Sequence, residues 1–418
     1  MATATIARGG ARAIRRVSAR QASASLSATL FYVFGPVPLY FAAARGFGGE
    51  DVALSGFVAV FATAGIFTAL LSWWSRQPLA LGWSLPGLLF MAASARDYSI
   101  NEIAGASMAA SVVVVALAFA GVVERVERAI PAEVAMAMLA GSALGLCVAP
   151  FTAFGEAPWI VGPALAGFLL ARKAGASWFP PAAGAVLVGL PAAVVFGPEP
   201  QIAAPGLPAL APVLPAFSLD AMAALVPPLT VFVLIGNTQG RTVLLGNGFA
   251  PPSREVGLAT GAMGAINAAF GGPPSSMQRV AMAVLTGDEA GPREGRWVAA
   301  SLAAAGCLAI ALLAVPLGAF TGSLDRAFID TLIGLLLLKV LADALKRTTE
   351  SGSMAGPIAF CIAASTMTLG GLRPEFWALA IGCGAAWFER QEGMAALPFG
   401  TGSRHNPRTQ RIEGATPR

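Results

Sequence analysis

The chain has 418 residues, of which 56% are hydrophobic and 12% are charged. Soluble domains carry about 25% charged residues, so this composition excludes an ordinary soluble protein and predicts an all-α polytopic membrane protein. The net charge of +5 comes from tails and loops and indicates no nucleic-acid partner. The single histidine and the four cysteines, which lie inside apolar runs, form no cluster with metal-ligand spacing. We therefore expect no metal, no other cofactor and no enzymatic activity.

Apolar segments follow one another along most of the chain, with short polar connections between them. About fourteen segments are expected, and a helix needs about 20 residues to span a bilayer. In chain order they cover residues 25–44, 53–73, 79–94, 103–123, 131–149, 158–171, 178–196, 220–240, 256–270, 273–286, 297–319, 327–345, 356–370 and 374–389. The third and tenth segments are too short to cross the membrane as plain helices.

Both short segments also contain helix breakers. The third holds Gly82-Trp-Ser-Leu-Pro-Gly87, and the tenth begins within Gly271-Gly-Pro-Pro-Ser-Ser276, with the prolines and then Ser275 and Ser276 at the predicted helix start. Glycine and proline end a helix, whereas proline beside serine is typical of a new helix start. The sequence thus predicts two discontinuous segments whose helices begin at membrane depth, which lipid permits only where the helix start is buried in protein or lines a cavity.

Basic residues indicate the orientation of the chain, because cytoplasmic connections carry the excess of Lys and Arg. With both termini in the cytoplasm, only four basic residues face outward: Arg45, Arg96, Arg326 and Arg373. We therefore expect a multi-pass protein of the bacterial inner membrane. The Arg-rich, acid-free start of the chain leaves an organellar transit peptide as the alternative.

The connection 197–219, rich in Pro and Ala, divides the segments into seven and seven. Because seven is odd, the second half enters the membrane in the opposite orientation, which makes a 7+7 inverted repeat. The predicted organisation is a basic cytoplasmic arm, two repeats separated by a periplasmic linker, and a disordered cytoplasmic tail. These cover residues 1–21, 22–196, 197–219, 220–389 and 390–418.

Two helix starts that meet inside the membrane would each present a partial positive charge to an anion. We expect substrate ligands at these breaks and in the eighth segment, with two aromatic side chains as walls. The predicted ligands are Ser84, Asn237, Ser275, Ser276, Gln278 and Arg279, and the predicted walls are Trp83 and Phe34. The alternatives are helix capping for the serines, snorkelling for Arg279, helix–helix hydrogen bonding for Asn237, and packing for the aromatic residues.

Lys339 and Asp343 lie four residues apart inside the twelfth segment, where they can pair on one helix face. Ionisable residues inside a span are functional candidates, and these two are the candidates for coupling. A structural salt bridge near the inner end of the segment is the alternative that we favour.

The chain resembles the benzoate/proton symporters over most of residues 22–389. The resemblance rests on Gln77-Pro-Leu-Ala-Leu-Gly-Trp-Ser-Leu-Pro-Gly87, on Ile130-Pro with Ala137-Met-Leu-Ala-Gly141, and on Thr368-Leu with Phe376-Trp377. It implies a core domain (segments 1–4 and 8–11) that moves against a gate domain (segments 5–7 and 12–14), with substrate between segments 3 and 10. It also implies transport of benzoate or a related aromatic carboxylate, by proton symport and alternating access.

Two other families of the same inverted-repeat fold are similar in part. The nucleobase–ascorbate transporters resemble Gly272-Pro-Pro-Ser-Ser-Met-Gln278 and carry glutamates at the positions of Asn237 and Gln278, which are neutral amides here. Sulfate permeases resemble Ser275 to Arg279. A nucleobase or inorganic-anion transporter is therefore the alternative, a passive channel or a membrane enzyme is more remote, and a homodimer is one possible assembly.

Overall fold

The computed structural model of the protein describes residues 17–34, 36–129, 131–174, 181–201, 203–204, 206, 210–367, 369 and 374–395. These residues are mainly helical. The helices are α2 (Ala19–Phe34), α3 (Pro36–Ser75), α4 (Leu85–Ser94), α5 (Ile100–Phe119), α6 (Val123–Ala129), α7 (Ala132–Glu156), α8 (Pro158–Ala174), α9 (Pro181–Phe196), α10 (Leu219–Gly246), α11 (Ser253–Ala268), α12 (Arg279–Thr286), α13 (Arg296–Leu312), α14 (Ala314–Ser323), α15 (Arg326–Thr349), α16 (Ala355–Ala363) and α17 (Pro374–Ala395). The strands are β1 (Leu81–Trp83) and β2 (Ser275–Met277).

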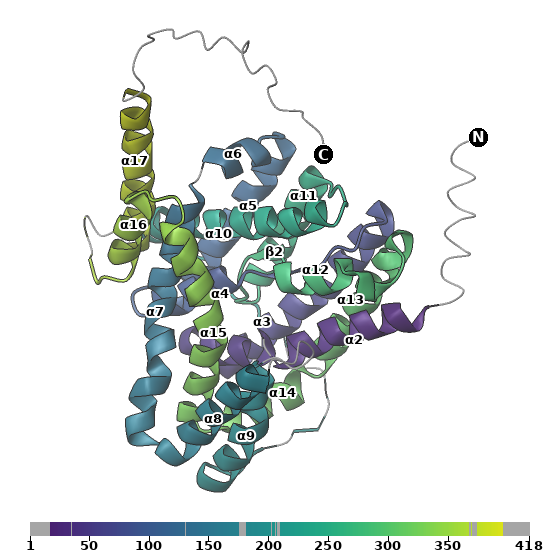
Figure 1. Cartoon of the computed structure of the whole chain (residues 1–418). Coiled ribbons are helices and arrows are strands. Elements are labelled where there is room, and N and C mark those ends of the chain that lie inside the picture. The colour runs from purple at the N-terminus through teal and green to yellow at the C-terminus, as the bar shows by residue number, and fades with distance from the viewer. Residues whose placement is uncertain are drawn as a thin grey trace, which may run out of the picture.

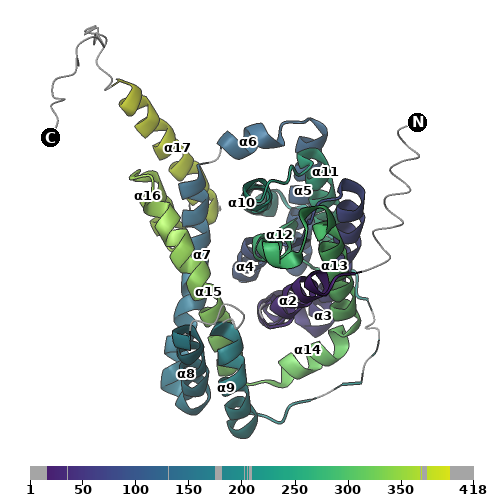
Figure 2. The ribbon, with the colours of Figure 1, turned by 45° about the vertical axis from the view of Figure 1, so that its right-hand side comes forward.

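The helices pack into two groups that Figure 2 separates clearly. Helices α2, α3, α4, α5, α10, α11, α12 and α13 form the core bundle. Helices α7, α8, α9, α15, α16 and α17 form the side bundle. Each bundle joins helices from both halves of the chain: α3 packs on α13 and α5 on α11, while α7 packs on α15.

Six helical stretches of the described residues are long and apolar enough to cross a membrane: Ala19–Phe41, Gly48–Ser75, Ile100–Phe119, Ala132–Glu156, Leu219–Gly246 and Arg293–Leu312. Two predicted boundaries need correction. The expected segment 297–319 is two helices, because α13 ends at Leu312 and α14 begins at Ala314. Helix α17 extends to Ala395, into the tail predicted to be disordered. Residue Gly49, at φ +75°, divides α3 into two helices, inside the gap predicted between segments 25–44 and 53–73.

The two interrupted segments meet at the centre of the core bundle, where Figure 1 shows β2 between α10 and α12. Strands β1 and β2 pair antiparallel, with Gly82 opposite Ser276. Backbone hydrogen bonds extend the pair at both ends, from Ser84 N to Pro274 O (2.7 Å) and from Gln278 N to Ala80 O (2.8 Å). Unpaired amides are costly where water is absent, so this pairing is what allows extended backbone to lie between the helices.

Helices α4 and α12 begin directly after the two strands, so the predicted interruption of both segments is confirmed. One detail was wrong: Ser275 and Ser276 do not begin the helix of the tenth segment. They form β2, and the helix begins at Arg279. Gly271, at φ +74°, makes the turn that ends α11 and leads the chain back into β2.

The second part of the linker between the halves lies against the core bundle. Its backbone amides donate to three helices of the core bundle: Ala211 N to Ser55 Oγ on α3 (2.7 Å), Val213 N to Ala269 O at the end of α11 (2.8 Å) and Ala216 N to Asn101 O in the first turn of α5 (2.8 Å). Its chain passes Gly105 so closely that a β-carbon there would lie 2.1 Å from Ala216 O. This part of the linker is therefore a fixed element of the core bundle.

Candidate functional site

A cavity of about 370 Å³ lies where the paired strands of the core bundle face the side bundle. Ligand pockets in proteins have volumes of about 300–1,000 Å³, so this one holds a small molecule. Its walls are mainly apolar, with a few polar groups gathered at the start of α12. The lining residues are Phe31, Pro36, Leu39, Trp83, Leu85, Pro86, Ala135, Met136, Leu139, Phe232, Ile235, Gly236, Gln239, Ser276, Met277, Gln278, Arg279, Val280, Leu337 and Asp343.

The two helix starts at the cavity are not equivalent. The start of α4 is satisfied locally, because Gly87 N donates to Ser84 Oγ (3.2 Å) and Pro86 has no N–H to leave unpaired. No described side chain caps the start of α12, and its first two residues, Arg279 and Val280, line the cavity. The positive end of a helix dipole and its free amides therefore open onto the cavity at α12.

Arg279 adds a full positive charge at this point. Its Nη2 lies 3.9 Å from Asp343 Oδ2, and the two side chains are 38% and 37% exposed. At this distance and exposure the pair is weak, about 0–1 kcal/mol. Arg279 belongs to the core bundle and Asp343 to the side bundle, so the pair bridges the two. The side chain of Lys339, the other predicted coupling residue, lies outside the described residues.

Ser276 and Gln278 complete the polar side of the cavity. The Ser276 hydroxyl makes no hydrogen bond to any residue that the structure describes, although the residue is 4% exposed. Gln278 Nε2 donates to Trp83 O (2.7 Å), which fixes the amide across the strand pair. The hydroxyl of Ser276 is therefore available to a bound anion.

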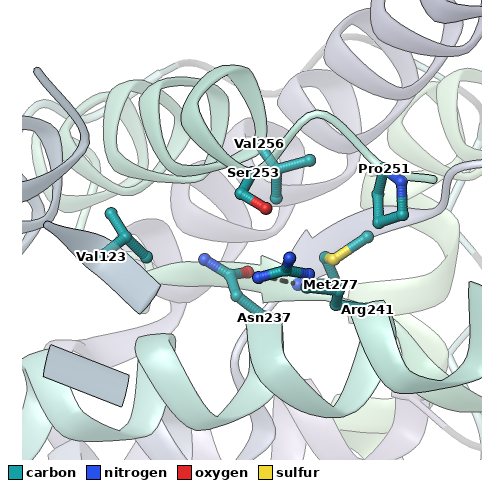
Figure 3. Close-up of a pocket in the computed structure, with 7 residues that line it drawn as sticks. All are labelled: Val123, Asn237, Arg241, Pro251, Ser253, Val256 and Met277. Carbon is teal, nitrogen blue, oxygen red and sulfur yellow. Dashed lines mark hydrogen bonds between the residues drawn. The ribbon is translucent and has the colours of Figure 1, made fainter. Parts of the chain in front are cut away.

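Asn237 holds strand β2 against helices α10 and α11, and it does not line the large cavity. Its Oδ1 accepts from Met277 N (3.0 Å) and its Nδ2 donates to Thr260 Oγ1 (3.1 Å), so it ties β2 to α10 and α11. Figure 3 shows Asn237, Arg241 and Met277 around a second cavity of only about 10 Å³. A cavity of that size holds at most one water molecule, so it is not a substrate site.

The side chain of Ser275 also contacts the protein interior and does not line the large cavity. It is fully buried and lies 2.9 Å from the amide of Asn267, which lies 2.9 Å from Thr63 Oγ1. Turning the Asn267 amide lets its nitrogen donate to Thr63 Oγ1 and its oxygen accept from Ser275 Oγ, and we adopt that orientation. Asn267 was not among the predicted residues, although an amide inside an apolar segment was the signal that singled out Asn237.

Aromatic side chains form three walls of the cavity. Trp83 comes from β1, Phe31 from α2 and Phe232 from α10. Trp83 is held by an edge-on contact with Tyr40, whose ring centre lies 5.9 Å away. The side chain of Phe34, the other predicted wall, lies outside the described residues. Sequence reasoning missed Phe232 and Met136, which come from helices distant in sequence from the two breaks.

Replacing Asn237 with leucine is expected to destabilise the protein. The change leaves the buried Met277 N–H without an acceptor, which costs about 1–3 kcal/mol. The measurement is the thermal unfolding midpoint in detergent. Asn247→Leu is the matched control, because Asn247 is an exposed amide near the end of the same helix. Equal midpoints for the two variants would contradict the scaffold role of Asn237.

A many-helix membrane protein in which two interrupted helices meet head to head at a partly polar cavity is, by class, a membrane transporter. The sequence matches the benzoate membrane transport protein family over residues 16–388, and the chain belongs to that family.

Two relatives are similar to this chain over most of their length. The inner membrane protein YdcO of Escherichia coli is 26% identical over 343 residues, which are 80% of this chain and 87% of that protein. The benzoate membrane transport protein of Acinetobacter baylyi is 25% identical over 381 residues, which are 86% of this chain and 92% of that protein.

Solved structures with the same fold are more distant in sequence. The transmembrane domain of the cyanobacterial bicarbonate transporter BicA matches with a TM-score of 0.59 at 16% identity, over 89% of this chain and 99% of that one. The murine anion transporter Slc26a9 in its inward-facing state matches with a TM-score of 0.59 at 14% identity, over 90% of this chain and 69% of that one. These likenesses support the polytopic helical fold.

Proposed function

We propose that the protein is a secondary active transporter of a small aromatic carboxylate, with benzoate as the first candidate, and that it works by proton symport and alternating access. The single observation that carries the proposal is the lining of the cavity: one arginine at an uncapped helix start, surrounded by apolar and aromatic walls.

The proposed pose follows from the two kinds of wall. The substrate carboxylate lies at the start of α12, where it accepts from Arg279, from the free amides of the helix and from the Ser276 hydroxyl. The aromatic ring lies between Trp83, Phe31 and Phe232, which supply an apolar surface and ring contacts.

Other anions fit this cavity less well. Bicarbonate and sulfate have no apolar part to bury. In this cavity they would lose hydrating water on the side of the apolar walls, which offer no hydrogen bonds in return. A nucleobase needs several polar partners in one plane, whereas Gln278 already donates to Trp83 O. An aromatic carboxylate uses both the charge and the apolar walls. A nucleobase or inorganic anion remains the alternative substrate.

The position of the cavity supports alternating access. Its polar side belongs to the core bundle, while Ala135, Met136, Leu139, Leu337 and Asp343 line it from the side bundle. Movement of one bundle against the other would open the cavity toward one side of the membrane and then the other. The inner-membrane relative in E. coli supports the same location here, and the basic connections favour cytoplasmic termini.

Uptake of radiolabelled benzoate into proteoliposomes tests the proposal. We expect accumulation that depends on an inward pH gradient and collapses when a protonophore removes the gradient. A thermal-shift screen with benzoate, uracil, xanthine and sulfate gives the substrate class independently, with benzoate expected to raise the unfolding midpoint most. Stabilisation by xanthine or sulfate alone would overturn the substrate, and uptake indifferent to every gradient would indicate a passive channel.

A further inference from the structure

Asp343 is the carboxylate that lines the cavity among the described residues, and it lies beside the cation proposed to bind the substrate. It reaches the cavity from α15 of the side bundle, whereas Arg279 stands at the start of α12 in the core bundle. A carboxylate of the protein therefore already occupies part of the space around Arg279 that a substrate carboxylate would take.

We propose that Asp343 is an internal counter-ion, that the substrate carboxylate displaces it from Arg279, and that Asp343 then takes up the proton carried with the substrate. This inference rests on the proposed function, because it needs an anionic substrate in the cavity. It assigns the proton to a residue, which the proposed function by itself does not do.

The electrostatic argument starts from the charges around Arg279. In the empty site, Arg279 and Asp343 together carry no net charge. An incoming carboxylate would leave two negative groups around one positive group in a mostly apolar cavity. Two carboxylates that share a site do not both remain ionised at low cost, so one of them takes up a proton.

Protonation of Asp343 gives the loaded site the same net charge as the empty one. The proton comes from water on the side to which the cavity is open, and it binds an oxygen of the Asp343 carboxyl. When the substrate leaves on the other side, Arg279 again attracts Asp343, and the proton returns to water there. The empty and the loaded transporter can therefore both change between the outward-open and inward-open states with a neutral site. An unbalanced charge in the site would be costly inside a membrane.

Other ionisable groups lie on the helix that carries Asp343 and on the helices packed against it. On its own helix these are Arg326, Asp330, Lys339, Lys346 and Arg347, and Lys346 pairs with Glu350 (3.8 Å). Helices α9 and α16, packed against α15, carry no charged residue. The other packed helices carry Arg45, Glu50 and Asp51 on α3, Glu133 and Glu156 on α7, and Arg172 and Lys173 on α8. The side chains of Arg45 and Lys339 lie outside the described residues. None of the others lines the cavity, and the cation of the cavity lining that pairs with Asp343 is Arg279.

Asp343→Asn tests the inference, because the variant keeps the shape and removes the titrating group. Isothermal titration of benzoate into the purified protein near neutral pH, in two buffers of different ionisation enthalpy, counts the protons taken up on binding. We expect about one proton per benzoate for the unaltered protein and none for Asp343→Asn. The variant should also bind benzoate more tightly, by about 3- to 10-fold, because the competing carboxylate is gone.

Asp330→Asn is the matched control, since Asp330 is the other carboxylate of α15 and pairs with Arg326 (3.6 Å) away from the cavity. Its proton count should equal that of the unaltered protein, and Asp343→Glu should keep proton uptake. If Asp343→Asn takes up the same number of protons as the unaltered protein, or if the unaltered protein binds benzoate without a proton, the inference is wrong. If the unaltered protein binds no aromatic carboxylate at all, the proposed function itself fails.

Discussion

Arg279→Gln is expected to lower benzoate uptake into proteoliposomes by about 10- to 100-fold. Most of the effect should be a rise in the benzoate concentration needed for half-maximal uptake. Hydrogen bonds to charged groups contribute about 1.5–3 kcal/mol each, and every 1.4 kcal/mol is a factor of ten in affinity. Glutamine keeps much of the side-chain length but removes the charge at the start of α12. The uncapped helix start remains, so binding should weaken without disappearing.

Two further variants separate charge from geometry. Arg279→Lys keeps the charge but loses the forked donor pair, so we expect uptake between those of Arg279→Gln and the unaltered protein. Arg326→Gln is the matched control, because Arg326 is an almost fully exposed arginine in an ion pair on α15. If Arg279→Gln and Arg326→Gln gave the same uptake, Arg279 would have no part in substrate binding.

The interruption of the two short segments was predictable from local chemistry. Gly82, Pro86, Gly271 and Pro273 leave no route for a continuous helix, and the bilayer allows a broken helix only inside protein. The same argument predicted that the breaks lie together. Local chemistry contains no information on the antiparallel pairing of β1 with β2, because the two strands are about 190 residues apart and each is too short to be recognised.

The predicted site residues divide by the direction in which their side chains point. Trp83, Ser276, Gln278 and Arg279 line the cavity, and Ser84 and Ser275 are buried against their neighbours. In an extended strand successive side chains point to opposite faces. Ser275 and Ser276 therefore have different surroundings, and a prediction that took both as part of a helix start could not tell them apart.

The amides illustrate a second limit. Asn237 and Asn267 are both costly inside an apolar protein unless they have partners, and the sequence gives no sign of whether the partner is a substrate or the protein. The structure supplies protein partners for both: Met277 N and Thr260 for Asn237, and Ser275 and Thr63 for Asn267. Their common effect is to hold β2 in place, which sets where Ser276 faces the cavity.

Gly236→Ala is expected to reduce benzoate uptake by at least about tenfold and to lower the thermal unfolding midpoint. A β-carbon at residue 236 would lie 2.5 Å from Ser276 Oγ and 2.6 Å from Ser276 Cβ. Ser276 cannot yield easily, because its backbone pairs with Gly82 across the strands. Overpacking of this kind costs about 1–3 kcal/mol, which exceeds the roughly 0.5–1 kcal/mol that alanine gains over glycine in a helix.

The control for this variant is Gly145→Ala in α7, where an added β-carbon meets no atom within 4 Å. That variant should unfold at or slightly above the midpoint of the unaltered protein and keep its uptake. The double variant Gly236→Ala/Ser276→Gly removes the atoms that clash, so its unfolding midpoint should recover toward that of the unaltered protein. Its uptake should stay low, because the Ser276 hydroxyl that faces the cavity is gone. If the double variant recovered both its stability and its uptake, the Ser276 hydroxyl would have no role in transport. The effect of Gly236→Ala on uptake would then come from packing alone.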